Sequence, residues 1–209
     1  RASYAAHISL DEVLEAKPVI DPLTRYEIAG FTDAAVVFVL ASEDIAKNHP
    51  HTVWLDGIGW ATETGTGGIE WHEWGRMPSI KEAARMAYKQ AGIHDPYNET
   101  DFAEVEDRFS FMELLALEEA GVAREGMAGD MLEAGDFDPK GDYPVNPSGG
   151  SLSIGVPLEA TGLSRLLEAV LQLRGRAGPH QLNDVSKALV LSWRGPPTYT
   201  SMAAIVSYD

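Results

Sequence analysis

Two apolar patterns give the clearest structural predictions for this chain. The run Ala34–Leu40 contains only apolar residues, which predicts a strand buried on both faces. A second pattern recurs with the period of a helix and ends before Gly175. It predicts an amphipathic helix that packs in the core and is formed around Leu163, Leu166, Leu167, Val170 and Leu171.

Shorter patterns predict the remaining elements. Strands are expected at Thr52–Trp60, Phe102–Val105, Lys187–Ser192 and Met202–Tyr208. Helices are expected at Leu10–Ala16, Ser42–Lys47, Ser79–Gly92 and Phe111–Leu117, the third opened by a capping box at Ser79. The acidic, glycine-rich stretch Gly126–Gly150 is expected to be a long loop, either functional or disordered. Strands that alternate with helices predict a layered α/β domain.

Composition and charge narrow the classes of function. The 209 residues carry a net charge of −16, which repels nucleic-acid backbones and anionic membranes. A polyanionic ligand such as coenzyme A therefore needs a local basic patch. The absence of cysteine excludes disulfides, thiolate metal sites and a cysteine nucleophile on this chain. The histidines lack paired ligand spacing, so no metal site is expected.

The chain shows neither a membrane span nor a signal peptide. Its longest apolar run is too short to cross a bilayer, and the opening residues lead directly into the first predicted helix. These features predict a soluble, cytoplasmic protein.

Four segments, in order, resemble the thiolase superfamily, and above all its archaeal and sterol-carrier-protein-linked branch. The motifs of that branch are His-Asp-Cys-Phe followed by a helix, Asn-Pro-Ser-Gly-Gly, Gly-His-Pro-x-Gly-Ala-Thr-Gly followed by a helix, and a Cys-x-Gly turn. The matching segments here are Val105–Glu118, Asn146–Gly150, Gly155–Gly175 and the turn around Trp193.

The resemblance implies a thiolase-like α-β-α-β-α fold of which this chain is mainly the C-terminal half. Residues 1–48 would be the tail of the N-terminal half, and residues 49–209 the C-terminal domain. In this family the first half carries a nucleophilic cysteine. The second half supplies a histidine that activates it, an acid/base cysteine and a group that holds an oxyanion. A complete member contains both halves, so this chain resembles a fragment, a split subunit or part of a longer chain.

The sequence departs from the family pattern at the positions that carry the chemistry. Glu106 and Val156 occupy the two histidine positions, Glu159 replaces a glycine, and Trp193 occupies the second cysteine, with Gly195 two residues later. Valine cannot transfer a proton, so the usual activation of a thiol is lost. An ionised Glu106 would repel an oxyanion, whereas a protonated one in an apolar pocket could donate a hydrogen bond.

Three residues are candidates for catalysis by this resemblance. Glu106, beside Asp107, is the candidate acid/base group, or it is a solvated charge at the end of a strand. Tyr199 could donate a proton to an enolate or alkoxide, or it is simply a packed aromatic residue in a turn. Glu159 is a further acid, or a carboxylate that stabilises the start of a helix. Asp107 is interpreted as a solvated charge at the end of a strand.

A second set of residues is predicted to bind the substrate. Ser148, Gly149 and Gly150 permit close approach of the backbone to a ligand, or they form a plain turn. Val156, Trp193 and Gly195 complete the set. Since family geometry brings their loops together, Glu106, Val156 and Trp193 are expected to gather at one pocket.

Two classes of function remain open. The first is an enzyme that cleaves or forms C–C bonds in acyl-CoA, as an atypical thiolase-like acyltransferase or a retro-aldolase of the lipid-transfer type in lipid metabolism. The second is a non-catalytic subunit that completes a complex. No cofactor is expected beyond the coenzyme A of the substrate. The expected assembly is a homodimer or a heteromer with an N-terminal half, and a small zinc-ribbon/OB-fold protein is a further partner implied by the resemblance.

Overall fold

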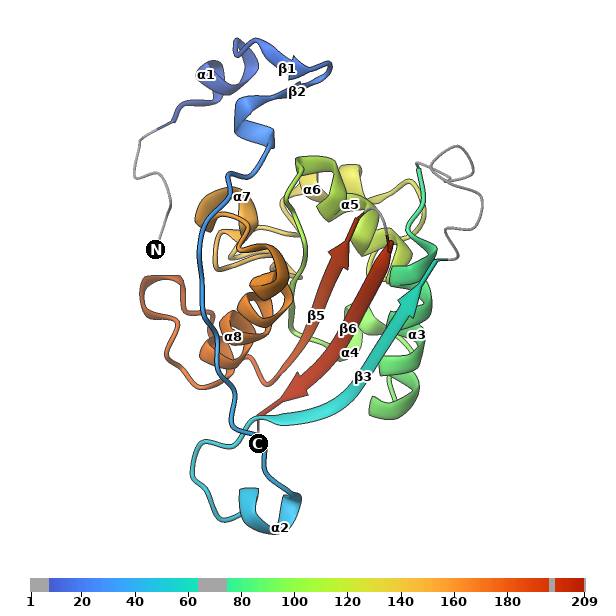
Figure 1. The fold of residues 1–209 in the computed structure, drawn as a ribbon, viewed down its shortest axis with the longest axis vertical. Coiled ribbons are helices and arrows are strands. Elements are labelled where there is room, and N and C mark those ends of the chain that lie inside the picture. Colours follow the sequence, from blue (N-terminus) through green and yellow to red (C-terminus); the bar gives the residue numbers. More distant parts are fainter. Residues whose placement is uncertain (1–7, 64–74, 196–197, 209) are drawn as a thin grey trace.

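The protein is described by a computed structural model that covers residues 8–63, 75–195 and 198–208. Its centre is a four-stranded sheet with the strand order β3-β6-β5-β4 (Figure 1). β6 pairs antiparallel with both of its neighbours, and β4 runs parallel to β5. The strands are β3 Trp54–Thr62, β4 Phe102–Glu104, β5 Lys187–Arg194 and β6 Thr200–Ser207. These bounds lie close to the predicted ones.

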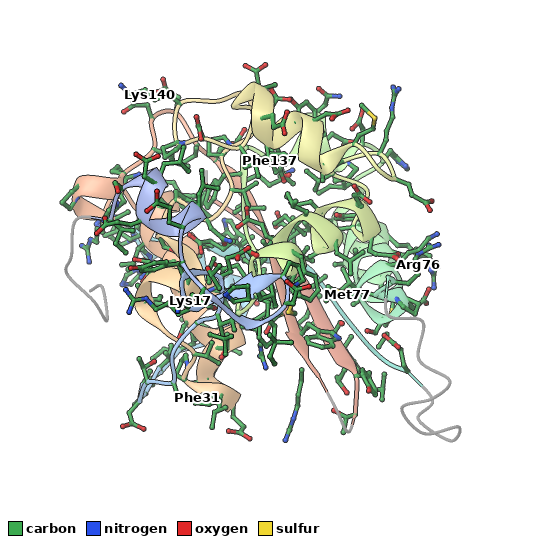
Figure 2. All side chains as sticks on the ribbon, turned by 90° about the horizontal axis from the view of Figure 1, so that it is seen from above. Lys17, Phe31, Arg76, Met77, Phe137 and Lys140 are labelled. Carbon is green, nitrogen blue, oxygen red and sulfur yellow. The ribbon has the colours of Figure 1, made fainter. Side chains whose placement is uncertain are left out.

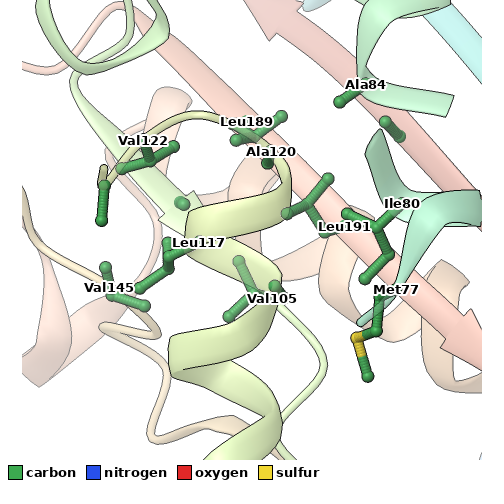
Figure 3. Packing of buried hydrophobic residues seen from close by; sticks show 14 of the residues in the cluster. Met77, Ile80, Ala84, Val105, Leu117, Ala120, Val122, Val145, Leu189 and Leu191 are labelled. Carbon is green, nitrogen blue, oxygen red and sulfur yellow. The ribbon is translucent and has the colours of Figure 1, made fainter. Parts of the chain in front are cut away.

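Helices cover both faces of this sheet. Alternate residues of β5 show the two layers: Leu189 and Leu191 pack into one hydrophobic cluster, and Ala188 and Val190 into the other. The first cluster contains residues of α3 Pro78–Ala91 and α5 Ser110–Glu119, and Figure 3 shows Ile80 of α3 near Leu191 of β5. The second contains α8 Thr161–Leu173. The predicted layered α/β fold is confirmed.

The other elements are short. They are α1 Leu10–Leu14, β1 Pro18–Ile20, β2 Leu23–Thr24, η1 Arg25–Glu27, α2 Glu43–Ala46, α4 Pro96–Glu99, α6 Ala128–Ala134, α7 Gly150–Ile154, η4 Leu158–Ala160 and η5 Gly178–His180. β1 and β2 form a separate hairpin, from which the chain runs alongside α8 to α2 (Figure 1). Among the described residues, no helix combines the length and apolarity needed to cross a membrane.

The prediction of a buried strand at Ala34–Leu40 is wrong. The run has no regular structure, and Val37 and Val39 are 86% and 93% exposed. Figure 2 shows Phe31, just before the run, at the outer surface of the molecule. A buried strand needs hydrogen-bonded neighbours at its edges and packed layers on its faces. The part of the chain that the structure describes supplies neither for this run.

The core helix is confirmed, but its buried face differs from the predicted one. Leu163 is 44% exposed, whereas Arg165, Ala169 and Leu173 are buried. The reason is that only one side of α8 meets the sheet, and the small side chain of Ala169 lets the helix pack closely there. The predicted leucine stripe therefore lies partly at the edge of that contact.

Two further predictions about local structure were wrong. The stretch Gly126–Gly150 is not an open loop, because it forms α6 and buries Phe137 and Tyr143. α3 has no capping box: Met77 stands at its N-cap position without a side-chain hydrogen bond, and the Ser79 hydroxyl donates to Glu63 at 2.7 Å. Residues 64–74, which include His72, lie outside the described residues.

Two glycines set how closely β3 packs on α3. A Cβ at Gly57 would lie 2.2 Å from the Ala87 carbonyl oxygen, and one at Gly59 would lie 2.1 Å from that of Ala83. Both contacts are with backbone, which cannot move aside as a flexible side chain can. The strand and the helix are therefore in contact through their main chains.

We expect Gly59→Ala to destabilise the protein by about 1–3 kcal/mol, the usual cost of overpacking. The reason is that β3 must move away from α3 to admit the methyl group. The measurement is the midpoint of urea unfolding, compared between variants whose unfolding free energy has the same dependence on urea concentration. Gly129→Ala is the control, because Gly129 lies in α6 with no atom within 4 Å of the added Cβ. An equal effect of the two substitutions would contradict the packing argument.

Candidate functional site

A cavity of about 680 Å³ lies between α5, the start of α8 and the β5–β6 hairpin. Its wall is mainly apolar, and Phe109, Met112 and Leu163 are among the residues that line it. The charged residues of the wall are Arg76, Arg108, Arg194 and Glu159. An apolar cavity with a few charged groups at its wall is the usual form of a small-molecule site.

A buried ion pair joins β4 to α8 behind the cavity wall. Glu104, at the end of β4, and Arg165, in α8, are 0% and 1% exposed. The Arg165 Nη1 atom lies 3.1 Å from the Glu104 Oε2 atom. Ser148 donates to the same carboxylate through its hydroxyl at 2.8 Å and its backbone N–H at 3.1 Å. Burial still raises the pKa of Glu104 to about 7, although Arg165 acts in the opposite direction.

Asp107 is not the solvated charge that was predicted. It is 3% exposed, and its carboxylate accepts the backbone N–H groups of Ser151 and Leu152 at the start of α7. A carboxylate in that place satisfies N–H groups that have no partner within the helix. Gly150 makes this possible, because a Cβ there would lie 1.9 Å from the Asp107 carboxylate. The second glycine of the motif thus has a structural role.

Glu106 and Arg108 lie between the cavity and these buried contacts of Glu104, Arg165 and Asp107, which together form a frame. Glu106 is 1% exposed, and its Oε1 atom accepts from Arg108 Nε at 3.1 Å. Its Oε2 atom is buried without a hydrogen-bond partner among the described residues. Burial raises the pKa of Glu106, and the charge of Arg108 partly offsets that effect. Arg108 also donates from Nη2 to the Trp193 carbonyl at 3.2 Å.

The structure brings the three family loops to one place. Arg108 joins the Glu106 loop to the Trp193 strand. Val156 belongs to the same region, since Ala29 N–H donates to the Arg108 carbonyl while Val156 N–H donates to the adjacent Gly30 carbonyl. Val156 itself is 2% exposed. The cavity is lined by Arg108 and Trp193, but Glu106 and Val156 are not part of its wall.

The other predicted residues lie in different settings. Tyr199 is buried, with its ring centroid 6.3 Å from that of Trp193. Glu159 lines the cavity and pairs with Arg194 at 3.6 Å, both side chains being mostly exposed. Gly195 lines the cavity. Ser148 faces the buried Glu104 carboxylate instead.

Glu113 is a half-buried residue with a perturbed carboxyl group that the sequence analysis missed. Its Oε2 atom accepts from Asn146 Nδ2 at 2.6 Å, and the Asn146 Oδ1 atom accepts from Val105 N–H at 2.8 Å. Burial raises the pKa of Glu113 to about 7, and the charge of Asp107 adds to the effect. Asn146 has a φ of 47°, a left-handed conformation that asparagine tolerates better than most residues. The first residue of the Asn-Pro-Ser-Gly-Gly segment therefore joins the Glu113 carboxyl to the backbone of Val105.

Arg108 and Arg165 were also missed. Arg108 stands at the cysteine of the His-Asp-Cys-Phe motif, so an unusual cation in a family motif was the available signal. Arg165 has no comparable signal, because a charged residue in an amphipathic helix is normally exposed. Within the described ranges, no group of three or more His, Cys, Asp or Glu residues could hold a metal ion.

Comparison with known proteins identifies a family for most of the chain. Residues 63–207 match the family described as thiolase C-terminal domain-like. Acetyl-CoA acetyltransferase of Methanothermobacter thermautotrophicus is 34% identical over 186 residues, covering 87% of this chain and 47% of the relative. Sterol carrier protein 2 of Gallus gallus is 35% identical over 194 residues, covering 90% of this chain and 35% of the relative. The chain thus spans half or less of these curated relatives.

Solved structures show the same fold. The Ltp2-ChsH2(DUF35) aldolase superposes with a TM-score of 0.80 at 23% identity, covering 97% of this chain and 52% of that chain. A monomeric SCP2-thiolase like protein from Mycobacterium smegmatis gives a TM-score of 0.66 at 19% identity, covering 100% of this chain and 42% of that chain. These neighbours have the thiolase fold, as the sequence predicted.

The buried carboxyls predict a loss of stability as pH rises. The pKa of Glu113 is about 7 in the folded protein and near 4.5 when exposed, so the folded state binds the proton more tightly. Stability is therefore greatest below about pH 4.5 for this group and falls as pH rises through about 7. We expect Glu113→Gln to make that fall smaller, because an amide does not titrate in this pH range. The amide oxygen can still accept from Asn146, so the hydrogen bond is kept.

Unfolding by urea at about pH 5 and about pH 8, which bracket most of that range, measures the effect. Glu82→Gln is the control, since Glu82 is exposed on α3 and Arg85 lowers its pKa. A wild-type pH dependence in Glu113→Gln would refute the assignment.

Proposed function

Because the chain belongs to the thiolase family, in which it matches the C-terminal domain, we propose that it acts on acyl-CoA by cleaving or forming a C–C bond. The observation that carries this proposal is the position of Glu106: a buried carboxyl with a raised pKa, joined by Arg108 to the wall of an apolar cavity. A carboxyl group that exchanges its proton more readily near neutral pH suits acid/base catalysis.

The reaction would differ from that of an ordinary thiolase. Val156 and Trp193 offer no group that activates or replaces a thiol, so the second half would contribute Glu106, with Tyr199 as a proton donor. Glu159 is more exposed, which suits a place at the cavity mouth. The nucleophile or base of the other half would come from a longer chain or a partner. The fold shared with an aldolase and the relation to an acetyltransferase support both a retro-aldolase and an acyltransferase reaction.

The proposal includes an assembly. The relatives are about twice as long or longer, which supports a homodimer of complete chains or a heteromer with an N-terminal half. A similar fold occurs in the aldolase named with a DUF35 component, which supports a small zinc-ribbon/OB-fold partner. No cofactor is proposed apart from the coenzyme A of the substrate, and a cytoplasmic location stays a prediction.

A non-catalytic subunit is the second candidate. It is favoured by the buried, apolar Val156 at the histidine position and by the absence of Glu106 from the cavity wall. Such a subunit would bind acyl-CoA or complete a complex without turnover. The two candidates differ in whether any variant of the intact assembly turns over an acyl-CoA ester.

We expect Glu106→Gln to lower kcat by about 10²–10⁴, the usual effect of removing a positioned acid/base group. His72→Ala is the control and should stay near wild type, because the two family histidine positions are Glu106 and Val156. The measurement is cleavage and condensation of several acyl-CoA esters by the intact assembly. Full activity in Glu106→Gln would exclude the catalytic role, and tight binding without turnover would favour the non-catalytic subunit.

Val156→His is the companion variant. It would restore a general base only where a thiol from the other half lies beside it. A gain of thiolysis in this variant is therefore expected if the intact protein carries the family's nucleophilic cysteine. The intact mass of the protein determines whether an N-terminal half is present on the same chain.

A further inference from the structure

The cavity gathers positive charge in a strongly acidic protein. The chain carries a net charge of −16, yet three arginines and only one carboxylate line this cavity. All three arginines pair with acids: Arg76 with Glu119 at 2.6 Å, Arg194 with Glu159 at 3.6 Å and Arg108 with Glu106 at 3.1 Å. The third, Arg108, is the least exposed of the three side chains, at 23%.

Arg108 is held on two sides by fixed partners. Its Nε atom donates to Glu106, and its Nη2 atom donates to the carbonyl oxygen of Trp193 on β5. The guanidinium carbon lies 5.9 Å from the centroid of the Trp193 ring, within the range of a cation–π interaction. Because these contacts come from the loop after β4 and from β5, the guanidinium is positioned before any ligand arrives.

Donors remain available at this point of the wall. A guanidinium has five N–H donors, and the contacts of Arg108 with described residues use one on Nε and one on Nη2. The Trp193 Nε1 atom is also buried without an acceptor in the described part of the chain. A buried donor without an acceptor carries a cost, which a ligand oxygen would remove. Arg108 thus has N–H donors beyond those that its two partners use, and Trp193 has one buried N–H without an acceptor among the described residues.

We propose that Arg108 binds an anionic oxygen of the acyl group in this cavity, with its guanidinium held against β5 by the Trp193 carbonyl and ring. The inference rests on the proposed acyl-CoA function and adds a residue to it. The shared chemistry is an oxygen with negative charge beside an apolar chain. It is either the enolate oxygen that develops next to the thioester or a carboxylate carried by the acyl chain. Arg108 would favour both, since a fixed cation in a poorly solvated wall binds charge more strongly than water does.

The test removes the guanidinium without leaving a buried charge. Loss of Arg108 alone would leave Glu106 unpaired and risk misfolding, so the principal variant is Glu106→Gln/Arg108→Met in the intact protein. Glu106→Gln alone keeps the guanidinium. Glu82→Gln/Arg85→Met is the matched control, because it removes an exposed ion pair on α3 outside the cavity. Thermal unfolding confirms that each variant is folded.

Three esters serve as probes. Acetoacetyl-CoA loses a proton to solvent and becomes an enolate with its own ultraviolet band, so titrating that band with pH gives the pKa of the bound ester. Butyryl-CoA and succinyl-CoA are of similar length, but only the second ends in a carboxylate, and their dissociation constants are compared. None of these readouts requires turnover.

For the enolate, wild type and Glu106→Gln should lower the pKa of bound acetoacetyl-CoA by about 1–3 units, as a cation within a few ångströms does. The double variant should lose this lowering of the pKa. At a fixed pH, the ratio of enolate to neutral ester then falls about tenfold for each unit of pKa that is lost. For the carboxylate, wild type should bind succinyl-CoA more tightly than butyryl-CoA, and the double variant should lose the preference. Either loss supports the proposal and identifies the oxygen.

Unchanged pKa shifts and unchanged preference in the double variant would overturn the role of Arg108 while leaving the proposed function intact. The same effects in the Glu82→Gln/Arg85→Met control would also overturn it, because they would then follow from the loss of any ion pair and not from the place of Arg108 in the cavity wall. Failure of wild type to bind any of the three esters would overturn the proposed function together with this inference.

Discussion

The ion pair between Arg165 and Glu104 is the constraint on which the site depends. It joins the middle of α8 to the end of β4, and Ser148 ties the turn before α7 to the same carboxylate. Removing two charges from water is costly, so a buried pair is tolerated only with good geometry and further hydrogen bonds. The Arg165 charge also opposes the rise in pKa that burial causes at Asp107 and Glu106. One buried cation therefore stabilises several acids in the loop after β4.

The direction of successive side chains in that loop follows from this frame. Val105 is held by its N–H bond to Asn146, and Asp107 reaches the start of α7 across the bare backbone of Gly150. With its neighbours fixed, Arg108 extends to β5 and reaches the cavity. Glu106 remains buried behind it. Glu106 and Arg108, which depart from the family pattern, thus rest on a frame built around residues of the family motifs. This explains how the fold is kept while the reactive groups change.

Local patterns predicted most of the fold, and long-range pairing explains the failures. The sheet strands were found because β5 and β6 are continuous apolar runs buried on both faces. Ala34–Leu40 shows the same pattern but lies exposed, since a strand needs neighbours that a local pattern cannot supply. In the site, motif positions led to Glu106, Val156 and Trp193. Arg165 and Glu113 could not be found that way, because their burial depends on partners distant in sequence.

We propose that the cavity between α5 and α8 receives the acyl group beside Arg108 and Trp193. A crystal structure of the intact protein with a bound acyl-CoA ester would reveal where that group lies. We expect the acyl chain against Phe109 and Met112, with an oxygen within hydrogen-bond distance of the Arg108 guanidinium. An ester bound elsewhere, with this cavity empty, would refute the proposed placement.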